Sequence, residues 1–229
     1  MRYLRQAIAL LLLLSAITLT AKENQKPPAK HSTYYYQRKT LFEKLPNARN
    51  EIIFLGNSIT DGCEWAELFN DLRVKNRGIS GDVTQGVLDR LQEVVESKPA
   101  KIFIMIGVND LARGLSVDEV VSNYRKILQG IRSASPETRI YIQSVLPVND
   151  HFTKFKNHVN KTEQIMAVNE HLVKMADEFD HTVYIDLFSP FATDDNKLNP
   201  EYTNDGLHLT GDGYLLWKSL VQDYVFDRK

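Results

Sequence analysis

Residues 51–60 read E-I-I-F-L-G-N-S-I-T and join an apolar run to a turn of small and polar residues. The run from Ile52 to Leu55 shows little alternation, which is typical of a strand buried on both faces of a parallel sheet. Gly56 lets the backbone turn tightly after it. Ser58 is therefore expected at the carboxyl end of a strand and the start of a helix, where open α/β sheets place their ligands. We take Ser58 as a candidate nucleophile, although a serine in such a turn is more often only a helix N-cap.

Apolar runs and segments with helical periodicity alternate along the rest of the chain, which predicts an α/β fold. A five-stranded parallel sheet with helices on both faces, a three-layer α/β/α sandwich, follows from this alternation. The further strands are expected near 73–79 and at 101–107, 139–146 and 182–188. Helices are expected at 34–45, around Trp65, at 83–95 with Thr84 as N-cap, at 116–131 with a Ser116–Glu119 capping box, at 160–179, and after His208.

Length and composition favour one globular domain. The chain has 229 residues, of which 43% are hydrophobic, and a net charge of -1, so it can bury a full core. Because basic and acidic residues are interspersed, the sequence shows no electrostatic footprint for nucleic acid or for an anionic membrane surface. The expected partner is a small or neutral molecule.

The first residues differ in composition from the rest. Arg2 and Arg5 precede an apolar run that ends near Leu19 and is shorter than the roughly 20 residues that span a bilayer. We interpret 1–21 as a signal peptide, 22–33 as a flexible lead-in and 34–229 as the domain. The sequence thus predicts an exported protein, periplasmic or secreted, without stable membrane insertion after cleavage. An uncleaved anchor is the alternative. Cys63, the single cysteine, excludes an internal disulfide and is expected to be a small buried residue.

Polar residues and glycines follow several of the expected strands. Gly81 follows the second strand, Asn109 the third, and Asp205 with His208 the fifth. Since parallel strands share one carboxyl edge, these residues and Ser58 are expected near one another. A serine nucleophile needs a base, a group that orients the base, and donors for the oxyanion. His208 suits the base, and Asp205, three residues earlier, would reach its ring if the two stood in a helical turn.

The order of four short motifs resembles that of the SGNH (GDSL-type) hydrolase family. G-N-S-I-T at 56–60 resembles its first block, S-G-D at 80–82 its second, G-V-N-D at 107–110 its third and D-G-L-H at 205–208 its last. The resemblance implies a flavodoxin-like fold with Ser58 as nucleophile, His208 as base and Asp205 as its orienting group. It also implies an oxyanion hole made by Ser58, Gly81 and Asn109. Asn57 stands where the family often has aspartate, and we expect this difference to affect local turn geometry only.

Other catalytic motifs are missing from the sequence. G-x-S-x-G is absent, which argues against an ordinary α/β-hydrolase, and neither H-E-x-x-H nor a cysteine pair indicates a metal site. Asp194 and Asp195 are interpreted as a solvated loop. The reaction that the resemblance implies requires no cofactor and no metal.

The leading hypothesis is an exported serine esterase that removes short acyl groups, foremost acetyl, from a carbohydrate. Its carbohydrate part depends on the family resemblance. A lysophospholipase, a thioesterase and an enzyme like platelet-activating-factor acetylhydrolase stay open within the family, and a non-catalytic carbohydrate-binding protein is the alternative of another class. Loops 147–155 and 189–204 are expected to border the site, and Asn149, Asp150 and His151 are candidate sugar contacts.

Overall fold

A computed structural model describes residues 30–228 of the chain, and one compact unit begins at Tyr34. The signal peptide predicted for 1–21 and most of the predicted lead-in lie outside the described residues. None of the helices in the described part is long and apolar enough to cross a membrane.

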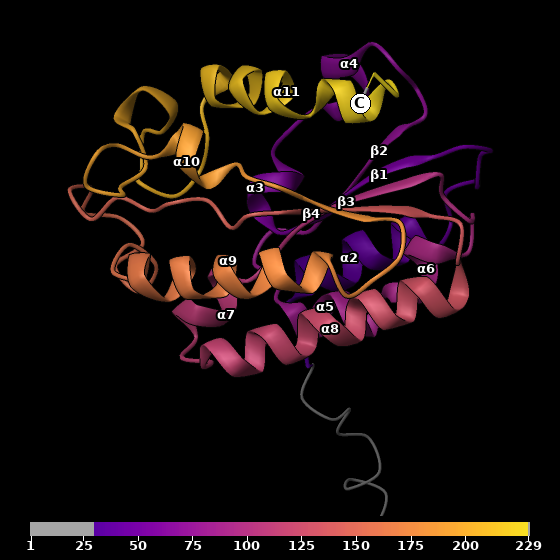
Figure 1. Ribbon diagram of the computed structural model, residues 1–229, viewed down its shortest axis with the longest axis horizontal. Coiled ribbons are helices and arrows are strands. Elements are labelled where there is room, and N and C mark those ends of the chain that lie inside the picture. The colour runs from indigo at the N-terminus through magenta and orange to yellow at the C-terminus, as the bar shows by residue number, and fades with distance from the viewer. Residues whose placement is uncertain (1–29, 229) are drawn as a thin grey trace, which may run out of the picture. The chain divides into compact units, whose positions relative to one another are not determined.

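The central sheet has five parallel strands in the order β2-β1-β3-β4-β5, which confirms the predicted α/β fold (Figure 1). The strands are β1 (Ile52–Gly56), β2 (Val74–Gly78), β3 (Lys101–Met105), β4 (Arg139–Gln143) and β5 (Thr182–Ile185). Because β2 lies on one side of β1 and β3 on the other, the chain reverses its direction of winding at β1. Ligands of open α/β sheets bind beyond the carboxyl ends of the strands at such a point.

Three strands end earlier than the sequence suggests. The expected strand 101–107 stops at Met105, 139–146 stops at Gln143 and 182–188 stops at Ile185. Ser144 explains the boundary at Ile185, since its hydroxyl accepts hydrogen bonds from the backbone N–H groups of Leu187 (2.8 Å) and Phe188 (2.7 Å). These bonds turn the chain away from the sheet and into the short helix α10 (Phe188–Phe191).

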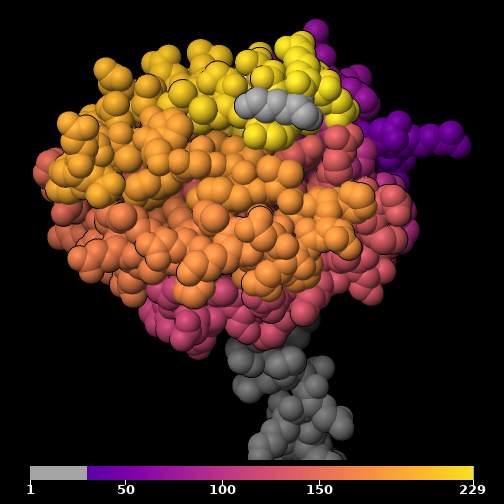
Figure 2. Space-filling view, in the orientation of Figure 1, coloured from indigo at the N-terminus to yellow at the C-terminus, as the bar shows by residue number. Residues whose placement is uncertain are grey.

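Helices cover both faces of the sheet (Figure 1). On one face lie α2 (Thr33–Phe42), α5 (Thr84–Asp89), α6 (Leu91–Val95), α8 (Val117–Ala134) and α9 (Thr162–Ala176). On the other lie α4 (Trp65–Phe69) and α11 (Gly211–Val225). The remaining short helices are α3 (Ser58–Asp61), α7 (Val108–Ala112) and the 3-10 turn η1 (Pro200–Tyr202). In Figure 2, α9 in orange and the chain from β5 to α11 form most of the visible surface of this unit.

Stacked aromatic rings fill the core beneath α4 and α11. Phe54 of β1 stacks on Trp65 with ring centroids 3.9 Å apart, and on Phe103 of β3 at 4.8 Å. Trp217 of α11 meets Trp65 edge-on at 4.9 Å. In addition, the Tyr214 hydroxyl donates to the Ile59 carbonyl at 2.8 Å. Since α11 begins soon after His208, this packing fixes the last helix, and the segment that leads into it, over the end of β1.

The capping box predicted for 116–119 is present at the start of α8. The helix predicted for 83–95 is wrong in two respects. It is interrupted at Arg90, which separates α5 from α6, and its N-cap is Val83 rather than Thr84. Thr84 instead gives its hydroxyl and its N–H to the buried carboxylate of Asp110, at 2.5 Å and 3.0 Å. A buried carboxylate requires such donors, and Thr84 supplies them from the first position of α5.

Candidate active site

The structure brings Ser58, His208 and Asp205 together although they are far apart in the sequence. Ser58 is the first residue of α3, and the N-cap is Asn57, whose side-chain oxygen accepts from the Ile59 N–H at 3.0 Å. The Ser58 Oγ lies 2.9 Å from the His208 Nε2, and the His208 Nδ1 lies 2.8 Å from the Asp205 Oδ2. The imidazole thus lies between a hydroxyl and a carboxylate, in hydrogen-bond contact with both.

Asp205 reaches His208 through a bend, and the helical turn expected from their spacing is wrong. Residues 204–208 are bends, and Gly206 has a positive φ of 84°. A Cβ on Gly206 would lie 2.4 Å from the Asn149 carbonyl, so the bend needs glycine. In this conformation the Asp205 Oδ1 accepts from the N–H groups of Leu207 (2.9 Å) and His208 (2.8 Å).

The charge on Asp205 is favoured by these hydrogen bonds. Burial alone would raise its pKa, but the bonds from the backbone and the ring of His208, and from the Leu207 N–H, hold the pKa below its ordinary value. Asp205 is therefore a stable anion at neutral pH, held behind the imidazole.

Ser58, Gly81 and Asn109 line one cavity of about 440 Å³. Gly81 has a φ of 78°, a left-handed conformation that favours glycine. The Asn109 Nδ2 donates to the Asp82 carbonyl at 2.8 Å. The other lining residues are Ser80, Ala112, Arg113, Phe155, Asn157, His158, Leu207 and His208. All predicted site residues except Asp205, which lies behind His208, thus face a common space.

Phe155 lies in the loop 147–155 that is expected to border the site, and it is the residue of that loop that lines the cavity, whereas His158 lies beyond the loop and is not predicted from the sequence. The His158 Nε2 lies 2.9 Å from the Asn109 Oδ1, and Phe155 packs edge-on against the His208 ring at 4.9 Å. Burial, with the nearby His208 and Arg113, lowers the pKa of His158, so its ring is neutral at neutral pH. No motif surrounds these residues. An aromatic residue and a histidine within a polar loop were the only signals available.

The loops were assigned only partly correctly. Of the expected sugar contacts, Asn149 is buried and donates to the Leu198 carbonyl at 2.8 Å, and Asp150 pairs with Lys197 at 2.7 Å. Neither they nor His151 line the cavity at Ser58. Among the described residues, segment 189–204 contributes nothing to this lining and instead borders a separate groove against α9.

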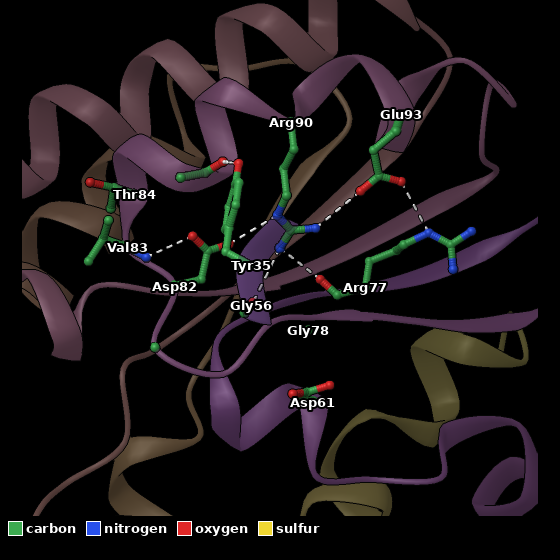
Figure 3. A network of polar contacts seen from close by, with 12 residues as sticks. Tyr35, Gly56, Asp61, Arg77, Gly78, Asp82, Val83, Thr84, Arg90 and Glu93 are labelled. Carbon is green, nitrogen blue, oxygen red and sulfur yellow. Dashed lines mark hydrogen bonds and ion pairs between the residues drawn. The ribbon is translucent and has the colours of Figure 1, made fainter. Parts of the chain in front are cut away.

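A buried ionic network lies beneath the loop that carries Gly81 (Figure 3). Arg90 pairs with Asp82 at 3.0 Å and with Glu93 at 3.1 Å, and Glu93 also pairs with Arg77 at 3.2 Å. The Arg90 guanidinium further donates to the carbonyls of Gly56 (3.3 Å) and Arg77 (2.8 Å). The Asp82 carbonyl also accepts a hydrogen bond from the Asn109 side-chain amide. Arg90 therefore connects the ends of β1 and β2 to the residues that would stabilise an oxyanion.

Cys63 plays no visible part in the site. Its side chain is buried, as expected, and burial followed by the charge of Glu64 raises the pKa of the thiol to about 12. Within the described residues, no group of three or more histidine, cysteine or acidic side chains is arranged to hold a metal ion.

The arrangement can perform acyl transfer. A hydroxyl in contact with an imidazole, an imidazole in contact with an anion, and amide donors around one cavity are the parts that nucleophilic attack on an ester carbonyl needs.

Comparisons with known proteins agree with this chemistry. The sequence profile of the GDSL-like Lipase/Acylhydrolase family matches residues 54–216. Platelet-activating factor acetylhydrolase IB subunit alpha2 of Homo sapiens is 29% identical over 170 residues, which cover 72% of this chain and 71% of the human protein.

Solved structures are similar as well. A GDSL-like lipase from Bacteroides thetaiotaomicron superposes with a TM-score of 0.74 at 26% identity, covering 85% of this chain and 98% of the lipase. A catalytic mutant of an acetylxylan esterase from Geobacillus stearothermophilus gives a TM-score of 0.60 at 17% identity, covering 78% of this chain and 96% of the esterase. At that identity the likeness shows the fold alone.

Proposed function

The chain belongs to the GDSL-like lipase/acylhydrolase family, whose members are esterases, and from this premise we propose that it hydrolyses short-chain acyl esters, foremost acetyl esters, of a carbohydrate. The observation that carries the proposal is the contact of 2.9 Å between the Ser58 Oγ and the His208 Nε2 at a cavity lined by Gly81 and Asn109.

In the proposed reaction Ser58 attacks the ester carbonyl while His208 takes the hydroxyl proton. Asp205 holds the Nδ1–H of His208 and stabilises the imidazolium that forms. The oxyanion receives hydrogen bonds from the N–H groups of Ser58 and Gly81 and from the Asn109 amide. His208 then protonates the leaving alcohol. Water, activated by the same histidine, hydrolyses the acyl-serine and regenerates Ser58.

Two observations support a short acyl group. The cavity at Ser58 holds only about 440 Å³, and it must accommodate part of the alcohol as well. The curated relatives at 29% identity are named acetylhydrolases. The carbohydrate part of the proposal is supported by polar side chains in the lining, with Ser80 and Asn157 available to bind hydroxyl groups.

A second candidate, an acetylhydrolase acting on a lipid like platelet-activating factor, is favoured by the names of the same relatives. The two candidates share the acetyl group and differ in the alcohol. Activity on an acetylated sugar and on an acetylated ether phospholipid, each followed by release of acetate, separates them.

The test of the esterase itself is hydrolysis of p-nitrophenyl esters from acetate to decanoate by the purified protein and by Ser58→Ala. We expect acetate to be cleaved fastest and the variant to lose activity. Faster cleavage of long chains would contradict the acetyl preference and favour a lysophospholipase or thioesterase. Equal activity of Ser58→Ala would show that Ser58 is not the nucleophile, and no cleavage of any ester would favour a carbohydrate-binding protein.

We also propose that the protein is exported, because Arg2 and Arg5 precede an apolar run of signal-peptide length. Fractionation of cells that produce the full chain should find it outside the cytoplasm, shortened at its N-terminus. Retention of the full-length chain in the cytoplasm would contradict this.

A further inference from the structure

The charges that line the cavity at Ser58 are of one sign. Arg113 and two histidines are its titratable side chains, and no aspartate or glutamate is among the lining residues. One histidine, His158, has a lowered pKa, and the other, His208, is the proposed base. Arg113 is thus the one lining residue with a permanent charge, and no carboxylate lines the cavity with it. The charge of Arg113 also acts on the carboxyl of Asp110, which is buried behind the lining.

Arg113 is fixed in place by the loop that carries Gly81. It follows α7, the helix that bears Asn109, and its Nη2 donates to the Gly81 carbonyl at 2.6 Å. The side chain is otherwise exposed, and the ion pairs among the described residues do not include it. A guanidinium has five N–H donors in a planar fork, so one bond to Gly81 leaves donors for a ligand.

Further positive charge lies nearby in the sequence. Lys154 and Lys156 flank Phe155, which packs against the His208 ring, and both lysines are exposed. They do not line the cavity, but their charge adds to the positive potential at its rim.

We propose that Arg113 binds an anionic group, a carboxylate or a phosphate, on the alcohol portion of the ester. This inference rests on the proposed function. Since an acetyl group carries no charge, an anion recognised in this cavity must belong to the alcohol. Guanidinium binds carboxylate and phosphate through paired, charge-assisted hydrogen bonds. The preferred substrates are therefore acetylated acidic sugars.

The test compares esters that differ by one charge, using the full chain. The first set is the acetylated methyl glycosides of glucuronic acid, glucose 6-phosphate and glucose, with acetate release as the readout. Comparison of the glucuronic acid ester with the glucose 6-phosphate ester shows whether the enzyme prefers a carboxylate or a phosphate. A second pair, 4-acetoxybenzoate and its methyl ester, probes the same charge on alcohols that are not sugars.

Within each set, we expect the wild type to have a higher kcat/KM for the anionic ester than for the neutral one. Arg113→Gln should lower this preference about tenfold. Arg113→Lys should keep most of it, because the positive charge remains. Lys154→Gln, which removes a nearby exposed charge without changing the lining, should lower the preference far less than Arg113→Gln does. Added salt should reduce the wild-type preference, because the charge pair is partly solvated.

Three results would overturn the proposal. The first is a wild type without any preference for the anion in either set. The second is an Arg113→Gln variant that slows charged and neutral esters equally, in which case Arg113 acts only through Gly81. The third is a Lys154→Gln variant that lowers the preference as much as Arg113→Gln, which would assign the preference to general surface charge. Failure of the proposed carbohydrate esterase function gives a different result, in which no ester is cleaved or only the aryl esters are cleaved. If only the aryl esters are cleaved, 4-acetoxybenzoate and its methyl ester still decide the role of Arg113.

Discussion

His158 contacts Asn109, with 2.9 Å between the Nε2 of the imidazole and the Oδ1 of the amide. Because the Asn109 Nδ2 donates to the Asp82 carbonyl at 2.8 Å, the two contacts together fix which end of the amide carries the donors. One hydrogen of Nδ2 is left for a ligand. His158 therefore positions a donor of the proposed oxyanion hole without touching the Ser58 hydroxyl.

His158→Ala should lower kcat about tenfold or more with little change in KM, because the amide can then rotate away from the developing oxyanion. Complete loss of one oxyanion donor costs about 100- to 1,000-fold, which sets the upper limit of the effect. Steady-state kinetics on p-nitrophenyl acetate measures it. His151→Ala, in an exposed histidine outside the cavity, is the matched control and should behave as wild type. Unchanged kcat in His158→Ala would contradict the positioning role.

Asp205→Asn should reduce kcat by about 1,000- to 10,000-fold, a loss typical of triads in which the amide holds the histidine in the wrong tautomer. The Asp205 Oδ2 is the partner of the His208 Nδ1 at 2.8 Å, so an amide nitrogen at that place would meet an N–H. Folding should be intact, as monitored by circular dichroism, since the Oδ1 contacts to the backbone can remain. A loss of less than tenfold would mean that another group orients His208.

Arg90→Met should destabilise the protein by about 3–5 kcal/mol, because it removes the cation that compensates the buried carboxylates of Asp82 and Glu93. Arg90 has an exposed fraction of 1%, and it pairs with Asp82 and Glu93. Urea unfolding gives the free energy. The control is Arg125→Gln, which breaks an exposed ion pair with Glu178 and should cost less than about 1 kcal/mol. Equal effects of the two changes would show that the buried network contributes little.

Asp110 should make stability depend on pH in the mildly acidic range. Burial raises its pKa to about 6, despite the hydrogen bonds from Thr84, whereas in the unfolded chain the pKa is about 3.9. The folded state therefore holds this proton more tightly. Its contribution to stability is complete below about pH 4 and is lost as the pH rises through 6.

The corresponding measurement compares wild type with Asp110→Asn by urea unfolding between pH 4 and pH 7.5. The stability of the wild type relative to the variant should increase on acidification, by up to about 3 kcal/mol in total. A difference that stays constant over this range would show that Asp110 is not perturbed.

Local sequence patterns predicted most of the fold. The apolar run at 52–55 and its successors at 101–105 and 139–143 become buried strands because their side chains face helices on both sides. The capping box at Ser116 is likewise a local feature, and it is present. Predictions failed where a distant partner intervened. Thr84 is the first residue of α5 rather than its N-cap, and its N–H and hydroxyl bind the distant Asp110. The strand after Thr182 ends early because the Ser144 hydroxyl accepts from the backbone N–H groups of Leu187 and Phe188.

By itself, the sequence determined the α/β class and the identity of Ser58, Gly81, Asn109, Asp205 and His208 as site candidates, because periodicity and short motifs depend only on neighbours along the chain. Tertiary structure alone decided that His158 joins this site, and that within the expected loop 147–155 it is Phe155 and not Asn149 that lines the cavity. It also decided that the Asp205–His208 contact is made through a bend. These features depend on contacts between residues far apart in sequence, such as His158 with Asn109 and Asn149 with Leu198. No local pattern encodes such a distance.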